Sequence, residues 1–118
     1  MRKALLTAVV VAGAAVAGAS TWHALAPITP THGTPAAIVG SPVLASWVSV
    51  QADPGNATGT CAGGTIEVKD SSGDIGANLA PGSSYTAVAT GGADLNLQQI
   101  YLDASASSCV ANVTYGQN

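Results

Sequence analysis

The sequence predicts an all-β protein, a small antiparallel β-sandwich or jelly-roll-like barrel that follows an N-terminal signal peptide and a Pro-rich arm. Short runs of alternating apolar and polar residues recur at intervals of about 8–12 residues, as in sandwiches and barrels. Gly, Pro, Asn and Asp separate these runs and supply turn chemistry. No segment after the leader has a helical period. Because Phe is absent, the core must be built from Val, Ile, Leu and Ala.

Residues 1–19 have the three parts of a secretory signal. Arg2 and Lys3 precede an apolar run over residues 4–19, and Ala17-Gly18-Ala19 offers a small-x-small cleavage site before Ser20. The apolar run is shorter than the roughly 20 residues that span a membrane. We therefore expect cleavage and export, with an uncleaved membrane anchor as the alternative.

Cleavage would leave Lys69 as the only basic residue of the chain against six acidic residues. Such a domain cannot neutralise a phosphate backbone, so nucleic-acid binding through a basic patch is excluded. We expect no nucleic-acid partner, and contact with a membrane only through an uncleaved leader.

Residues 20–42 are predicted to be a linker or extended arm. This segment contains four prolines among Thr, Ala and Gly and shows no period. Both histidines of the chain, His23 and His32, fall in it and are interpreted as solvated linker residues. On this interpretation the folded domain, residues 43–118, contains no histidine for catalysis or metal binding.

The predicted strands of the domain alternate in a way that assigns their faces. Val48, Val50 and Ala52 share one face, as do Ile66 and Val68, while Glu67 and Lys69 lie on the opposite side. Ile100, Leu102 and Ala104 are expected on one face with Tyr101 and Asp103 on the other. In the last strand Cys109, Ala111, Val113 and Tyr115 are expected to point inward. The expected strands lie within residues 43–52, 65–69, 75–79, 84–90, 95–104 and 109–115.

Cys61 and Cys109 are the only two cysteines, and in an exported chain pairing is the default expectation. Two thiols without a nearby histidine do not complete a zinc shell. A bond between them would tie the last strand to the early part of the sheet. We expect their α-carbons to lie about 4.4–6.8 Å apart.

Two groups of acidic residues could be sites, but each has a simpler explanation. Asp70 and Asp74 flank Gly73 without the alternating ligands of a calcium loop, so a solvated turn is favoured. Asp53 and Asp103 could form a carboxylate pair like that of a glycosidase, although Asp is common at strand ends for turn reasons. The serines lack a nucleophile elbow. We therefore expect no catalytic residues, no metal site and no cofactor.

The aromatic residues are the remaining candidates for a ligand-binding surface. If exposed together they would form a platform on which sugars stack, whereas the alternative places Trp47 in the core and the tyrosines at sheet edges. Asn56 and Asn112 stand in N-x-Thr sequons and are expected to be unmodified, because the leader is typical of a bacterial one. The four candidates for the platform are Trp47, Tyr85, Tyr101 and Tyr115.

Residues 43–118 also resemble a known module through several ordered pieces. These are VSVQADPGN (48–56), IEVKDSSG (66–73), LAPGSS (79–84), DL (94–95), IYLDAS (100–105) and VTYG (113–116). Together they resemble a small β-sandwich module of bacteriophage virion proteins and phage-like reading frames of bacterial genomes. Such modules usually lack a leader and a cysteine pair, so this chain would belong to a phage that assembles at the membrane or to the bacterial envelope.

The resemblance and the lack of catalytic motifs lead to one functional expectation and one alternative. The first is a non-enzymatic exported structural or surface-display domain, such as a capsid, spike or minor coat component of a phage virion. The alternative is a secreted carbohydrate-binding or adhesion module of a bacterial envelope. The expected partners are copies of the chain itself or other particle or envelope proteins. The expected location is periplasmic, extracellular or virion-associated.

Overall fold

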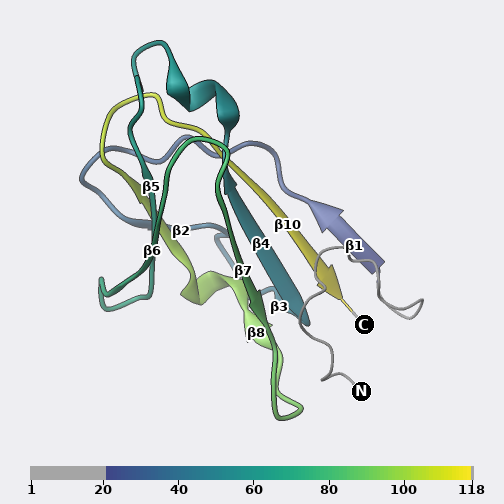
Figure 1. Ribbon diagram of the computed structural model, residues 1–118. Coiled ribbons are helices and arrows are strands. Elements are labelled where there is room, and N and C mark those ends of the chain that lie inside the picture. Colours follow the sequence, from purple (N-terminus) through teal and green to yellow (C-terminus); the bar gives the residue numbers. More distant parts are fainter. Residues whose placement is uncertain (1–20, 118) are drawn as a thin grey trace.

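The alternating segments pair into two four-stranded antiparallel sheets, as the computed structural model of residues 21–117 shows (Figure 1). The predicted all-β sandwich is confirmed. The leader predicted over residues 1–19 lies outside the described residues. Sheet A has the order β1 (Thr21–Ala24), β10 (Ala111–Gln117), β4 (Trp47–Ala52), β7 (Ser84–Val88), and sheet B the order β2 (Ala36–Ala37), β9 (Tyr101–Ala104), β5 (Ile66–Lys69), β6 (Ile75–Leu79).

The core lies between the inner faces of the two sheets and is aliphatic, as the composition predicts. β4 alternates strictly, with Val48, Val50 and Ala52 buried, and β5 buries Ile66 and Val68 in the same way. Cys109, Ala111 and Val113 are buried along the last strand, and Tyr115 is half-buried against the core. These predicted faces are confirmed, because a period of two in a half-buried strand fixes which side chains point inward.

Residues 21–42 are not a linker beside the domain, and the predicted boundary at residue 43 is wrong. β1 pairs with β10 along its whole length, and β2 pairs with β9, so the segment contributes an edge strand to each sheet. Between them, Ile28 forms an antiparallel bridge with Ala111. The prolines make the segment extended, as predicted, but its backbone donors and acceptors are used in the sheets.

The strand predicted over residues 95–104 is interrupted. Leu95–Asn96 is β8, which pairs with β3 (Leu44–Ala45) in a separate two-stranded sheet. A 3-10 turn, η3 (Leu97–Gln99), follows before β9. The Asn96 side chain starts this turn by accepting a hydrogen bond from the Gln98 amide at 3.0 Å, and the turn buries Leu97 completely.

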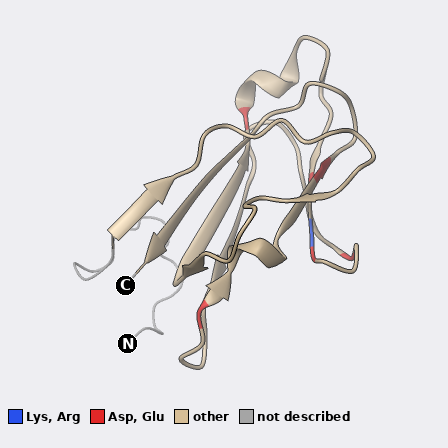
Figure 2. Cartoon of the chain, turned by 180° about the vertical axis from the view of Figure 1, so that it is seen from behind, with Lys and Arg blue, Asp and Glu red and all other residues tan. Residues whose placement is uncertain are grey.

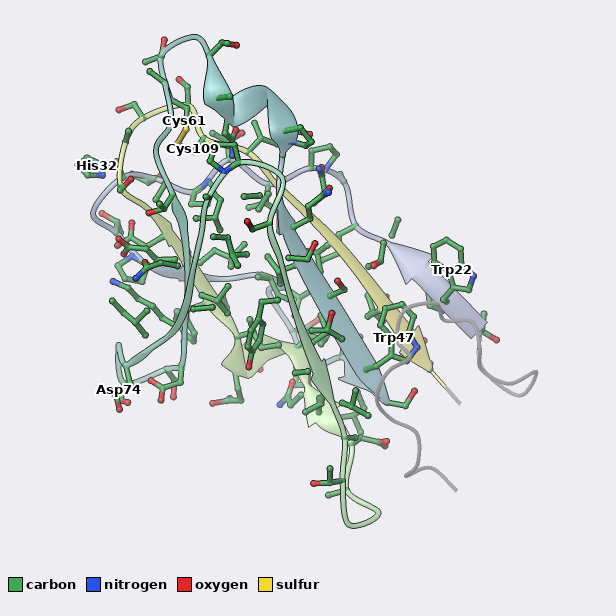
Figure 3. All side chains as sticks on the ribbon, in the orientation of Figure 1. Trp22, His32, Trp47, Cys61, Asp74 and Cys109 are labelled. Atoms are coloured by element: carbon green, nitrogen blue, oxygen red, sulfur yellow. A yellow bond between two sulfur atoms is a disulfide. The ribbon has the colours of Figure 1, made fainter. Side chains whose placement is uncertain are left out.

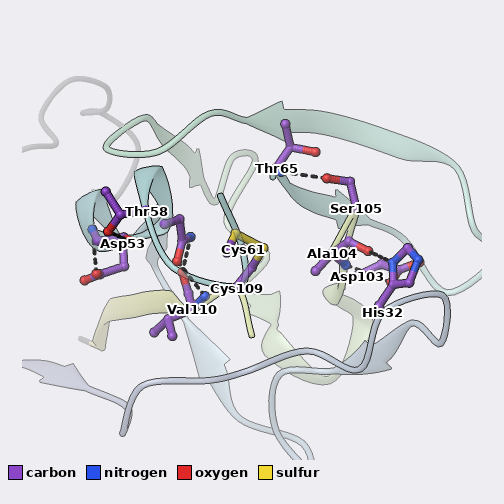
Figure 4. Close-up of a disulfide and its surroundings, with 12 residues drawn as sticks. His32, Asp53, Thr58, Cys61, Thr65, Asp103, Ala104, Ser105, Cys109 and Val110 are labelled. Carbon is purple, nitrogen blue, oxygen red and sulfur yellow. Dashed lines mark hydrogen bonds between the residues drawn. A yellow bond between two sulfur atoms is a disulfide. The ribbon is translucent and has the colours of Figure 1, made fainter. Parts of the chain in front are cut away.

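The predicted disulfide between Cys61 and Cys109 is present, with α-carbons 4.9 Å apart, and this prediction is confirmed (Figure 4). It links the loop after η2 (Pro54–Ala57) to the residues just before β10. A disulfide is typical of proteins that fold outside the reducing cytoplasm. Within residues 21–117 no helix has the length and apolar character needed to cross a membrane.

Candidate ligand-binding face

The four aromatic residues predicted as a platform do not come together. Trp47 alternates with buried Val48 and therefore lies on the outer face of sheet A. Tyr85 is paired with Val50, and Tyr115 with Val48, so both lie on the inner face and pack against the core. Tyr101 is paired with Lys69 on the outer face of sheet B. A single platform made of these four side chains is therefore wrong.

Instead, Trp47 shares its row of sheet A with Trp22, the residue that the predicted linker had excluded. Gly116 of β10 is in register with Trp22 of β1 on one side and with Trp47 of β4 on the other. Residues directly opposite each other in an antiparallel sheet point to the same face. Trp22 and Trp47 thus flank Gly116 on one surface, at the end of the sheet where β1 begins (Figure 3). We call these three residues the tryptophan row.

Gly116 holds the tryptophan row together because it has no side chain. A Cβ built on it would collide with Nε1, Cε2 and Cδ1 of Trp47, so the indole lies directly over the glycine backbone. Gly116 is consequently buried and Trp47 half-buried. Trp22 is 67% exposed and makes no part of the core. The sequence contains a signal for this arrangement, since a glycine within a predicted strand often marks close approach by another group.

The next two rows of the same face carry hydroxyl and amide side chains. Thr114, Ser49 and Thr86 stand side by side in register, and the Thr86 hydroxyl donates to Ser49 Oγ at 3.2 Å. Beyond them lie Asn112, Gln51 and Ser84. Each of these groups can donate and accept hydrogen bonds.

This outer face carries no formal charge. The four strands of sheet A contain no Asp, Glu, Lys or Arg, and Figure 2 draws them without red or blue. Asp53, just beyond the end of β4, accepts hydrogen bonds from the Asn112 amide at 3.0 Å and from the Gly55 backbone at 2.9 Å. The face therefore combines two indoles with neutral polar groups.

The two histidines belong to the fold and not to the linker that was predicted, although His32 is exposed to solvent and His23 is half-buried. The ring of His23 stacks on Tyr115 with centroids 5.1 Å apart, on the inner side of sheet A. Nδ1 of His32 lies 2.7 Å from the carbonyl oxygen of Ala104. Both contacts join the N-terminal segment to strands close to the other end of the chain.

Asp103 and Asp53 do not form the carboxylate pair considered from the sequence. Figure 4 draws them on opposite sides of the disulfide, and each has its own partners. Asp103 Oδ1 accepts from the backbone amides of Gly33 and Ala104, at 2.8 and 2.7 Å, and Oδ2 lies 3.3 Å from Lys69 Nζ. Asp103 thus links the N-terminal segment to sheet B through these contacts.

These contacts shift the pKa values of the ion pair. Burial alone would raise the pKa of Asp103, which is 5% exposed, but hydrogen bonds from Ala104, Gly33 and Lys69 bring it below its ordinary value. The Asp103 hydrogen bond, reinforced by Glu67 at 3.4 Å, raises the pKa of Lys69. The only lysine or arginine within residues 21–117 is therefore held on sheet B in ion pairs with Asp103 and Glu67.

In the acidic turn at residues 70–74, the Asp70 carboxylate accepts hydrogen bonds from other residues of the same turn. Asp70 Oδ1 accepts from the Ser72 hydroxyl at 2.7 Å and from the backbone amides of Ser72 and Asp74. These bonds lower the pKa of Asp70, chiefly the one from the Ser72 hydroxyl. In the part of the chain that the structure describes, no three His, Cys, Asp or Glu residues are grouped as metal ligands would be.

Asn56, the first of the two sequon asparagines, has a structural role that the sequence did not reveal. It is 2% exposed, and its amide donates to the Val110 carbonyl and accepts from the Val110 N–H, both at 2.9 Å. The Asn56 amide thus bonds both backbone groups of Val110, just before β10, as a neighbouring strand would. Its burial leaves no room for a glycan at this residue in the folded domain.

Comparisons of the chain with protein-family models, curated proteins and solved structures find no match. The resemblance to phage virion modules therefore stays a prediction.

Proposed function

We propose that the chain is a non-enzymatic domain that works outside the cytoplasm as a structural or surface-display component of a virion or a bacterial envelope. The observation that carries this proposal is the disulfide between Cys61 and Cys109, which closes an aliphatic sandwich. The secretory leader predicted from the sequence supports it. In a small extracytoplasmic domain the hydrophobic core is small, so a disulfide makes a large contribution to its stability.

The use of the polar groups supports a structural role. Asp53, Asp70 and Asp103 each hold turns or strands together. A hydrolytic site needs a carboxylate or nucleophile directed at a substrate. Here these carboxylates are directed at backbone amides.

The edges of the sheets offer surfaces for packing against other subunits. β1 and β7 are the edges of sheet A, and β2 and β6 those of sheet B. Ile75 in β6 is 53% exposed. Exposed edges with apolar side chains are surfaces through which β-domains assemble.

The test is to express the full chain in a bacterium, fractionate the cells and image the purified material by negative-stain microscopy. We expect the oxidised protein in the extracytoplasmic or particle fraction, assembled with itself or with envelope material. A strictly monomeric protein that stays in the cytoplasm would overturn the proposal.

A second candidate function is a carbohydrate-binding or adhesion module of a bacterial envelope. The specific observation that favours it is the tryptophan row on an uncharged face, in place of the platform of Trp47 and three tyrosines that the sequence suggested. Glycan arrays probed with the oxidised domain test it, and silence on every glycan would remove it.

A further inference from the structure

We infer that the outer face of sheet A binds an uncharged glycan chain, which lies across β1, β10 and β4 with Trp22 and Trp47 each stacking on a sugar ring. This inference deepens the second candidate function and rests on it. It assigns the site to the tryptophan row and the two polar rows beside it, and it names the class of ligand.

Trp22 has the properties of a binding residue and not of a core residue. It is 67% exposed at the edge of the sheet, where it packs against no core cluster. Tryptophan presents a large rigid apolar face with little conformational entropy to lose on contact. A sugar ring offers a matching apolar face of C–H groups. Stacking on a sugar would therefore bury the apolar face of the Trp22 indole, which is exposed to solvent in the free domain.

The spacing of the tryptophan row fits successive sugars of a chain. Trp22 and Trp47 are separated by one intervening strand, and neighbouring strands lie about 4.8 Å apart, so their backbones are about 10 Å apart. A disaccharide unit of a β-linked glycan spans this length. Because Gly116 has no side chain, the Trp47 indole lies over it and is held in place before any ligand arrives. A preformed platform reduces the cost of ordering on binding.

The polar rows supply hydrogen bonds at the correct distance from the indoles. Thr114 and Ser49 are two residues along their strands from Gly116 and Trp47, which places them about 7 Å away at about 3.4 Å per residue. A sugar stacked on Trp47 would direct one edge of hydroxyl groups toward this row. The hydroxyl and amide side chains can each donate and accept, as sugar hydroxyls do.

The charges of the domain select against an anionic ligand. The four strands of sheet A contain no Lys or Arg, and Lys69 is held on sheet B by Asp103 and Glu67. A uronic, sulfated or phosphorylated glycan would approach an acidic domain without gaining an ion pair. A neutral glycan needs no ion pair, so the absence of charge on this face does not weaken its binding. The face therefore favours an uncharged polysaccharide.

The test uses the oxidised full chain, and the two tryptophans are its own reporters. Both Trp residues of the chain lie in the tryptophan row, so intrinsic fluorescence should change on titration with neutral β-linked oligosaccharides such as cello- or chito-oligosaccharides. Polygalacturonate serves as the charged comparison. We expect saturable binding to a neutral glycan and none to the anionic one.

Trp22→Ala is the decisive variant, because an exposed edge residue can be removed without unfolding the domain. We expect at least about a tenfold loss of affinity, equivalent to about 1.4 kcal/mol of lost stacking. Trp22→Phe should retain part of the affinity. Ile75→Ala is the matched control, since it removes another exposed apolar side chain from the other sheet.

Three results would overturn the inference while leaving the extracytoplasmic role intact. The first is binding that Trp22→Ala does not weaken. The second is tighter binding to the anionic glycan than to any neutral one. The third is a protein that binds no glycan but loses self-association, measured by light scattering, when Trp22 is changed, because the face would then be a contact between copies.

Discussion

Gly116 controls the geometry of the tryptophan row at the scale of a single residue. An added methyl group at this position would meet the Trp47 indole. We predict that Gly116→Ala displaces the indole and lowers stability by about 1–3 kcal/mol, the usual cost of overpacking. In a Trp22→Phe background, Trp47 is the only tryptophan, so its emission should shift to the red.

Gly76→Ala is the matched control for this substitution. Gly76 also lies within a strand, β6, but a Cβ there would come no closer than 3.7 Å to its nearest neighbour, the Val68 carbonyl oxygen. Its substitution should leave both stability and emission nearly unchanged. Equal losses in the two variants would show that strand glycines matter here for backbone reasons and not because of Trp47.

Asp103 should make stability depend on pH in the acidic range. Its pKa in the folded domain lies below the ordinary value of 3.8, so its contribution is complete above that value and is lost as the pH falls through the folded pKa. We predict that Asp103→Asn lowers the free energy of unfolding by about 1–3 kcal/mol near neutral pH, since charged hydrogen bonds are removed. Urea unfolding should show this difference shrinking below pH 3.8.

Asp94→Asn controls for the change of net charge. Asp94 is exposed in the turn before β8. A difference between wild type and Asp103→Asn that stays constant from neutral to strongly acidic pH would contradict the role given to the carboxylate.

At the scale of elements, Asn56 joins the η2 loop to the start of β10. We predict that Asn56→Ala lowers stability by about 1–3 kcal/mol, because the Val110 N–H loses its partner and the Val110 carbonyl keeps only the hydrogen bond from the Asp53 N–H. Amide hydrogen exchange should become faster at Val110. The exposed Asn78 of β6 provides the control Asn78→Ala. Unchanged protection at Val110 would mean that the side chain is not what holds the loop.

The alternating strands could be predicted from the sequence because their pattern is local. In β4 and β5 every second residue is apolar, and both the strands and their buried faces follow from that period. The presence of only two cysteines, in a chain expected to be exported, likewise predicted the disulfide. These features could be predicted without knowing which strands pair with one another.

The N-terminal segment could not be predicted in the same way, because its order comes from distant residues. Thr21–Ala24 has no strong strand pattern and becomes β1 only by pairing with β10, near the other end of the chain. Its prolines pointed to a linker, and Trp22 was therefore left out of the candidate site. The sequence also did not predict the break after Asn96. There the Asn96 side chain accepts a hydrogen bond from the Gln98 backbone N–H, and this local bond replaces strand geometry.

For the whole molecule, the disulfide offsets the weakness of an aliphatic core. It joins residues 48 apart in sequence, so it removes much of the freedom of the unfolded chain. We predict that replacing Cys61 and Cys109 together by Ala lowers the free energy of unfolding by about 2–5 kcal/mol. Chemical unfolding of the double variant beside the reduced wild type measures this loss. A double variant as stable as the oxidised protein would contradict it.

The central claim is that this domain folds outside the cytoplasm and is closed by the bond between Cys61 and Cys109. Intact-mass measurement of the exported protein, alkylated before and after reduction, tests it most directly. The account predicts a chain that begins at Ser20 and takes up label on both cysteines only after reduction. A chain whose two thiols are alkylated before any reductant is added would contradict the claim.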